Sequence, residues 1–155
     1  MTWAQGQATI RAMLTDGQLQ QVPASRTHAD VLLAQAHAHL AAAQAIQDAD
    51  PTGAYALLYD AARKALVAVL ENQGLRPTRR GGHIAAYEAV RAELDPPLGA
   101  HLRPYDRMRR RRNESEYPSA DVPEVTTDEI SDDLPKVRTI LDIAAPVLDQ
   151  MSPWR

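Results

Sequence analysis

The sequence predicts an all-α protein, an up-and-down bundle of four main helices with additional short helices. Alanine, leucine, glutamine and arginine, all good helix formers, dominate the 155 residues, and phenylalanine is absent. Apolar residues recur at helical spacing along several segments, whereas β-branched residues never alternate with polar ones for long enough to indicate a strand. Short connections between these segments favour antiparallel neighbours, so one bundle is the expected architecture.

The first half of the chain is expected to contain three helices. A short one covers Trp3 to Leu14, and Ser25 is a natural N-cap for a second that runs to about Asp48. The third, from Ala54 to Gln73, is apolar on most of its circumference and should be the most buried. Gly74 follows as its C′ residue, because glycine tolerates the left-handed conformation that often ends a helix.

Two more helices are expected in the middle of the chain. One starts near Gly82 or His83 and ends before the two prolines at positions 96 and 97. The next begins around Pro97 or Leu98 and carries a run of arginines. Pro104 should kink this helix, because proline cannot donate a backbone hydrogen bond inside a helix.

The last helix is expected to open with a capping box formed by Thr126 and Glu129. Apolar residues then recur at helical spacing from Ile130 to Leu148. Pro135 and Pro146 interrupt this pattern, so we expect bends or a split instead of one straight helix.

One domain of ordinary size fits residues 1–155, with 1–24 as a short helix and loop and 26–150 as the bundle. Cysteine is absent, which excludes a thiol nucleophile, a disulfide and a Cys-based zinc site. The N-terminus lacks the features of a signal peptide and no long apolar stretch occurs, so a cytoplasmic protein without a membrane anchor is expected. His37 and His39 point about 200° apart on a helix and cannot chelate one ion together. We expect neither a metal nor a cofactor.

The charged residues are distributed unevenly, although the net charge is only −3. Residues 103–112 hold six arginines and one aspartate, and residues 114–133 hold eight acidic side chains and no basic one. Two interpretations of the acidic segment are open: a solvated linker, or a flap that folds over the arginines and competes with phosphates.

The arginine run divides between two faces of its helix. At about 100° per residue, Arg112 and Glu116 each fall within about 20° of Tyr105, on the apolar face. Arg110 and Arg111 point about 140° and 120° away from that face and are expected in water. Arg112 and Glu116 are therefore the candidates for a site that faces the bundle.

A second basic cluster consists of Arg76, Arg79 and Arg80, just before the helix that starts near His83. Its loop ends in two glycines. Flexible glycines and a helix N-terminus suit an anion, because free backbone N–H groups and the helix dipole both favour negative charge. These arginines and His83 are candidate phosphate ligands, and a solvated turn is the alternative interpretation.

Three segments together resemble the HEPN superfamily of helical-bundle proteins. They are Tyr59-Asp60-Ala61-Ala62-Arg63-Lys64-Ala65-Leu66, Gly81-Gly82-His83 and Arg112-Asn113, within a resemblance that runs from about residue 29 to residue 145. The family motif is an arginine, usually followed by a polar residue, with a histidine four to six residues further on. Many members are metal-independent ribonucleases, often toxins of toxin–antitoxin pairs, that dimerise so that two motifs face one cleft. The resemblance implies a homodimer that cuts RNA or binds nucleotides.

The sequence departs from the family motif at the histidine. With Arg112-Asn113 as the Arg-Asn pair, Tyr117 occupies the histidine position. Cleaving RNA without a metal needs a group that takes the 2′-hydroxyl proton near neutral pH, and a phenol is a poor one. Glu116 is an alternative base, although the neighbouring Arg112 favours its charged, weakly basic form. His83 or His101 can supply the imidazole from another element. On one continuous helix, His101 would lie about 40° from Tyr105, on the inward side.

Three functions are open at this point. The first is RNA or nucleotide binding through Arg109, Arg112 and Asn113, together with the basic loop. The second is a metal-independent ribonuclease toxin with Arg112, Asn113, Glu116 and Tyr117 as its catalytic residues. In the third, the chain is a protein-interaction module, with an antitoxin or other protein as partner, and an Arg112–Glu116 ion pair only stabilises the bundle.

Overall fold

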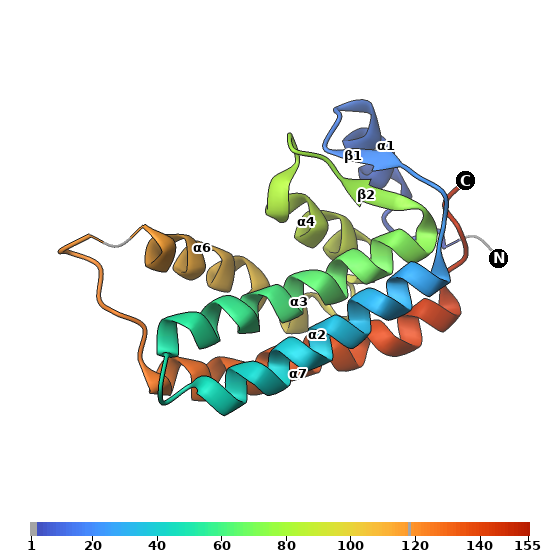
Figure 1. Cartoon of the computed structure of the whole chain (residues 1–155). Helices are drawn as coiled ribbons and strands as arrows, with labels where there is room; N and C mark the ends of the chain where they lie inside the picture. The colour runs from blue at the N-terminus through green and yellow to red at the C-terminus, as the bar shows by residue number, and fades with distance from the viewer. Residues whose placement is uncertain (1–2, 118) are drawn as a thin grey trace.

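The computed structural model describes residues 3–117 and 119–155, and it confirms the predicted all-α bundle. Three long helices lie side by side: α2 (Arg26–Ile46), α3 (Pro51–Gln73) and α7 (Thr127–Gln150). α2 runs antiparallel to both α3 and α7, which are parallel to one another (Figure 1). α3 is buried along most of its length, as its apolar circumference predicts.

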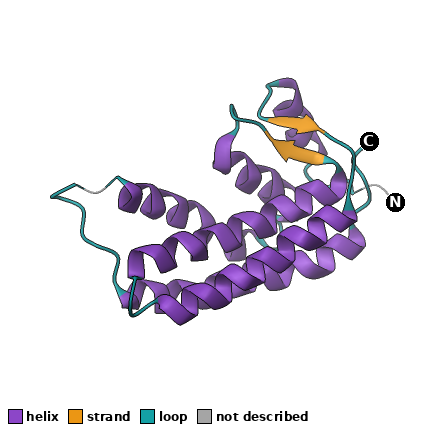
Figure 2. Ribbon diagram, in the orientation of Figure 1, coloured by secondary structure: helices purple, strands orange, loops and turns teal. Residues whose placement is uncertain are grey.

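Shorter helices pack against the remaining face of α3 (Figure 2). α4 (Gly82–Leu94) and α6 (Pro104–Glu116) both contact α3, and the single turn α5 (Gly99–Leu102) connects them. α1 (Gln7–Thr15) packs in turn on α4. α3 therefore lies between the other long helices and the short ones, so side chains on its second face can meet residues of α4 and α6.

Local signals in the sequence set several helix boundaries. The hydroxyl of Ser25 accepts a hydrogen bond from the backbone N–H of His28 at 3.0 Å, which caps α2. Thr126 and Glu129 form the expected capping box at the start of α7. Gly74 ends α3 in the left-handed conformation, with φ of 84°.

Several predicted helix features differ from the structure, among them the start of α3, which is Pro51 and not Ala54. α1 begins at Gln7 and not at Trp3, because Gly6 is its N-cap and has a left-handed φ of 81°, which interrupts a helix that would start earlier. Pro104 does not kink one helix as predicted. It is the first residue of a separate helix, α6, and α5 ends just before it at Leu102. α7 is not split and runs through its two internal prolines. Both of these prolines are exposed, so water can reach the carbonyl groups that they leave without a donor.

The sequence does not predict the small antiparallel sheet in which β1 (Leu19–Gln21) pairs with β2 (Leu75–Pro77). Each strand has three residues, which is too short for an alternating pattern to be recognised. The sheet ties the segment before α2 to the loop before α4. That loop carries the basic cluster predicted to bind phosphate.

Candidate functional site

Polar side chains from α3, α4 and α6 meet on the face of α3 that the short helices cover. At the centre lies Tyr59 of α3, whose side chain is buried. Its hydroxyl oxygen is 2.9 Å from Nδ1 of His83, at the start of α4, and 2.9 Å from the hydroxyl oxygen of Tyr105 on α6. The Tyr105 hydroxyl donates to the backbone carbonyl of His83 at 2.9 Å. These contacts hold His83 against both other helices.

Arg112 lies over the ring of Tyr59. Its guanidinium carbon is 5.9 Å from the ring centroid, within the distance of a cation–π interaction. Nη2 of Arg112 is 3.8 Å from Oε1 of Glu116, whose side chain is 43% exposed. Nε of Arg112 is buried and has no hydrogen-bond partner among the described residues. The ring therefore positions Arg112, while a long and solvated ion pair neutralises it only weakly.

Two more arginines, both only 26% exposed, surround this cluster. Nη2 of Arg109 on α6 lies 2.9 Å from Oδ1 of Asp106. Nε of Arg63 on α3 lies 3.4 Å from Oδ1 of Asp60, one turn before it. Each of these cations therefore has a carboxylate on its own helix.

Burial and the surrounding cations change the acid–base properties of the cluster. Burial lowers the pKa of His83 below its ordinary value of 6.5, and the positive charges of Arg63 and Arg112 lower it further. The imidazole is therefore neutral near pH 7. Burial raises the pKa of the Tyr59 hydroxyl, which stays protonated. The result is a neutral imidazole beside several fixed positive charges.

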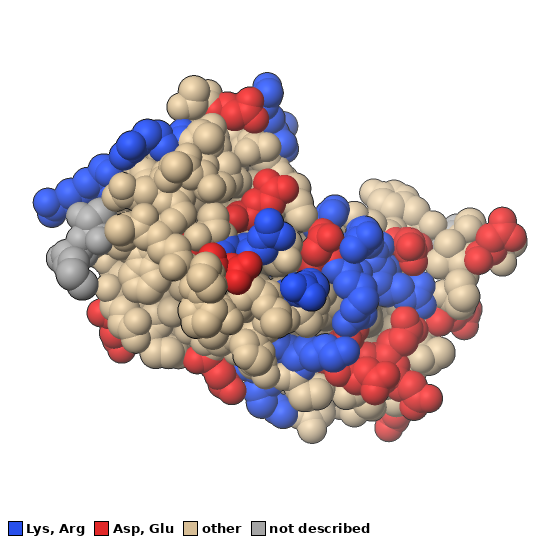
Figure 3. All heavy atoms as spheres, turned by 180° about the vertical axis from the view of Figure 1, so that it is seen from behind, with Lys and Arg blue, Asp and Glu red and all other residues tan. Residues whose placement is uncertain are grey.

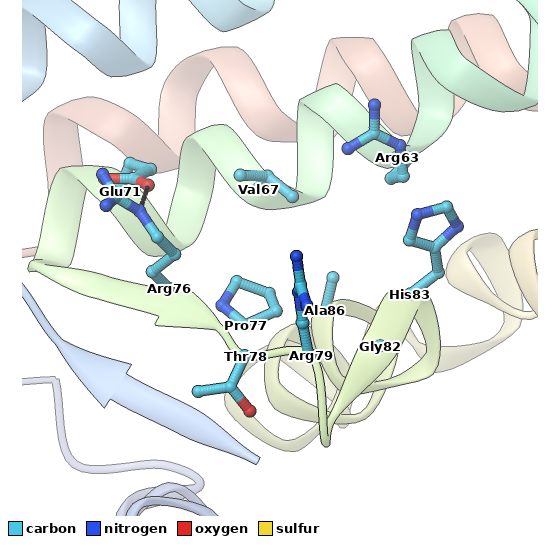
Figure 4. Close-up of a pocket in the computed structure, with 10 residues that line it drawn as sticks. All are labelled: Arg63, Val67, Glu71, Arg76, Pro77, Thr78, Arg79, Gly82, His83 and Ala86. Carbon is cyan, nitrogen blue, oxygen red and sulfur yellow. Dashed lines mark hydrogen bonds and ion pairs between the residues drawn. The ribbon is translucent and has the colours of Figure 1, made fainter. Parts of the chain in front are cut away.

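A groove with a volume of about 450 Å³ extends from His83 and Arg63 along α3 toward β2 (Figure 4). At its far end, Nε of Arg76 lies 2.6 Å from Oε1 of the buried Glu71. Arg79 extends toward the middle of the groove, as Figure 4 shows, and has no ion partner in the described part of the chain. Three residues provide apolar lining: Val67, Pro77 and Ala86.

The remaining predicted site residues lie apart from this cluster. Asn113 and Tyr117 are exposed at the end of α6, with Tyr117 at 81%. Arg80 lies outside the groove and pairs with Asp16 at 3.3 Å. His101 is exposed on α5, although the helical phase predicted an inward position. The break between α5 and α6 removes that phase relation.

The prediction that Arg111 lies in water is wrong. Its side chain is 15% exposed, and its Nε lies 2.7 Å from Oε1 of Glu129 on α7. Arg107 likewise forms two hydrogen bonds with Asp133, a buried carboxylate of α7. Arg110 is exposed, as predicted. A helical wheel describes one helix only, so it cannot reveal carboxylates that another helix contributes.

These pairs also show what part of the acidic segment does. Basic and acidic side chains lie next to one another on the face opposite to that of Figure 1, as Figure 3 shows. From residue 127 onward the segment belongs to α7, where Glu129 and Asp133 neutralise arginines of α6. Glu129 and Asp133 stabilise the contact between α6 and α7. For the loop before α7, the linker and the flap both stay predictions.

Sequence reasoning did not assign Tyr59, Arg63 and Tyr105 to a site. The spacing of Tyr59 predicts a core position, which the structure confirms, but the hydroxyl contacts depend on how three helices pack. A usable signal existed for Arg63, because it follows Tyr59 by one helical turn in the segment that carries the family resemblance. No such local signal links Tyr105 to His83.

Within residues 3–117 and 119–155, no three histidine, aspartate or glutamate side chains gather as ligands of a metal ion would. No described helix is long and apolar enough to cross a membrane.

The fold and the cluster define a class of protein: an all-helical bundle in which arginines and an imidazole surround a buried tyrosine. The chain matches the family model described as the HEPN domain over residues 29–147, and it belongs to the HEPN family. Neither a curated protein nor a solved structure gives a significant match to it.

Proposed function

We propose that the protein binds RNA, or a phosphate-bearing nucleotide, at the surface around Arg112 and His83. The supporting observation is that arginines of α3 and α6 converge with His83 of α4 beside Tyr59. Arg112 is the best phosphate ligand among them, because its contact with Glu116 is long and solvated. A guanidinium group that its carboxylate neutralises only weakly can form charge-assisted hydrogen bonds with phosphate oxygens.

The groove beside His83 gives a bound strand a second contact surface. Arg79 extends into it without an ion partner in the described part of the chain. The apolar lining suits a ribose or the face of a base. A strand with one phosphate at Arg112 can therefore continue toward Arg79. Arg76 is a weaker candidate, because Glu71 already neutralises it.

A protein-interaction module with a structural Arg112–Glu116 pair is supported less well. Ion pairs between partly exposed side chains contribute little to stability, and this one is 3.8 Å long. Homodimerisation, a toxin–antitoxin role and a partner protein stay predictions from the family resemblance.

Fluorescence anisotropy with a labelled mixed-sequence RNA at low salt tests the proposal. Arg112→Ala should weaken the affinity roughly tenfold or more, because a hydrogen bond to a charged group contributes about 1.5 to 3 kcal/mol. Arg110→Ala is the matched control, since Arg110 is 66% exposed and pairs with Asp106. An equal loss of affinity in both variants, or no binding by the unmodified protein, contradicts the proposal.

A further inference from the structure

The hydrogen bonds around Tyr59 determine where the protons lie. A hydroxyl group has one proton to donate, and a carbonyl oxygen can only accept. Tyr105 gives its proton to the carbonyl of His83, so Tyr59 is the donor in the 2.9 Å contact between the two hydroxyl groups. The Tyr59 oxygen then accepts from Nδ1 of His83, which lies 2.9 Å away. His83 therefore carries its proton on Nδ1.

The other nitrogen of the imidazole, Nε2, keeps a free lone pair. It has no hydrogen-bond partner within the described residues, and His83 is an exposed residue at the end of the groove. Partial burial of the ring, together with the positive charges of Arg63 and Arg112, lowers the pKa of His83 and keeps the ring neutral. A neutral imidazole with an accessible lone pair beside phosphate-binding cations is the arrangement that a general base requires.

We propose that His83 is the proton acceptor of a ribonuclease site at this surface, an inference that rests on the proposed RNA binding. Nε2 accepts the proton of a ribose 2′-hydroxyl group, and the 2′-oxygen attacks the adjacent phosphorus. The bond between phosphorus and the 5′-oxygen of the next nucleotide breaks, which leaves a 2′,3′-cyclic phosphate. The departing oxygen takes a proton from water, and His83 returns its own proton to water. Arg112 binds the phosphate oxygens, on which negative charge grows.

The imidazole in this proposal comes from α4 and not from the position after the Arg-Asn pair, where Tyr117 lies. Tyr59 and Tyr105 are positioning residues. They hold the proton on Nδ1 and thereby keep Nε2 ready to accept another. Tyr59→Phe removes the acceptor of the Nδ1 proton, so this variant should cleave more slowly while it binds RNA with little change.

Binding and cleavage of labelled RNA by the full chain, measured in parallel, test the inference. In His83→Asn the side-chain amide can still donate to Tyr59 but cannot act as a base at neutral pH. We expect cleavage about 100-fold slower or more, with a far smaller loss of RNA affinity than in Arg112→Ala, because the neutral amide removes no positive charge. His101→Asn, at an exposed histidine of α5, is the matched control and should cleave at the unmodified rate.

The two readouts separate the inference from the binding proposal. If the unmodified protein binds RNA without cleaving it, or if His83→Asn cleaves at the unmodified rate, the inference is overturned and the binding proposal stands. If the unmodified protein does not bind RNA, both are overturned.

Two further measurements follow the proton itself. The cleavage rate should rise with pH through a pKa below 6.5 and then stay level, because only the neutral form of His83 accepts a proton. Nitrogen-15 NMR of the imidazole should show a proton on Nδ1 and none on Nε2, and a mixture of the two forms in Tyr59→Phe. A proton found mainly on Nε2 in the unmodified protein overturns the inference.

Discussion

Glu93 is a carboxyl group in the core, 1% exposed, that accepts a hydrogen bond from Nε2 of Gln73 at 3.0 Å. Burial raises the pKa of Glu93 from its ordinary value of 4.5 to about 7. Between these two values the unfolded chain loses the proton while the folded protein keeps it. This group therefore makes the folded protein less stable as the pH rises through that range, and its full effect is reached above pH 7.

Glu93→Gln keeps an acceptor for Gln73 but has no proton to lose. The variant should be more stable than the unmodified protein at pH 8, by up to about 3 kcal/mol, and nearly equal to it at pH 4.5. Urea denaturation at both pH values measures the difference. Glu88→Gln, at an exposed position of the same helix, is the control and should show no such pH dependence. Equal stabilities of Glu93→Gln and the unmodified protein at pH 8 would contradict the prediction.

At the scale of the residue, the sequence predicts a position well where one helix decides it. Tyr105 and Met108 are fully buried, and Arg112 follows them on the same face, over Tyr59. Arg111 could not be predicted, because its burial depends on Glu129 from a helix that begins more than a dozen residues later. Periodicity indicates the face of a residue but not its partner.

At the scale of the element, Gly81 decides where α4 and hence His83 can lie. Its φ of −72° and ψ of −36° suit any residue, so no backbone strain requires glycine here. A Cβ atom at this position would instead overlap the carbonyl oxygen of Gln18 and lie 2.7 Å from Cβ of Ala85. Gly81→Ala should therefore displace the start of α4 and lower the free energy of unfolding by roughly 1 to 3 kcal/mol.

Gly82→Ala is the comparison for Gly81→Ala, because the space around Gly82 is open and only its φ of 61° opposes a side chain. Its cost should be about 1 kcal/mol. Urea denaturation gives both values, and the Nδ1 signal of His83 reports any displacement of α4. A Gly81→Ala variant as stable as the unmodified protein would show that Gly81 is not closely packed.

Elements with strong local signals were predictable and the others were not. The N-cap of α2 at Ser25, the capping box of α7 and the C-terminal glycine of α3 each depend on a few neighbouring residues, and all three are confirmed. The strands β1 and β2 stabilise one another only across more than fifty residues of sequence, and neither carries a pattern of its own. Pairing of that kind is a tertiary property.

At the scale of the whole molecule, the bundle was predictable but the composition of the site was not. Arg112 and His83 could each be named as candidates from the sequence. Their common neighbour is Tyr59, and this contact depends on how α4 and α6 dock on α3. The docking also divides the arginines of α6 into two groups. Carboxylates of α7 neutralise Arg107 and Arg111, whereas Arg112 lies over Tyr59 of α3.

The same separation of charge predicts how salt affects RNA binding. With a net charge of −3, the molecule as a whole repels a polyanion, so attraction must come from the few cations around the groove. Each phosphate that a single strand places on such a cation contributes about 0.7 to the slope of log affinity against log salt.

Arg79→Ala should lower the magnitude of this slope by about 0.7, because Arg79 has no carboxylate partner among the described residues and is free to bind a phosphate. Arg138→Ala, at an exposed position of α7, should leave the slope unchanged. If both variants change the slope equally, binding follows the overall charge of the molecule and the groove does not direct the strand.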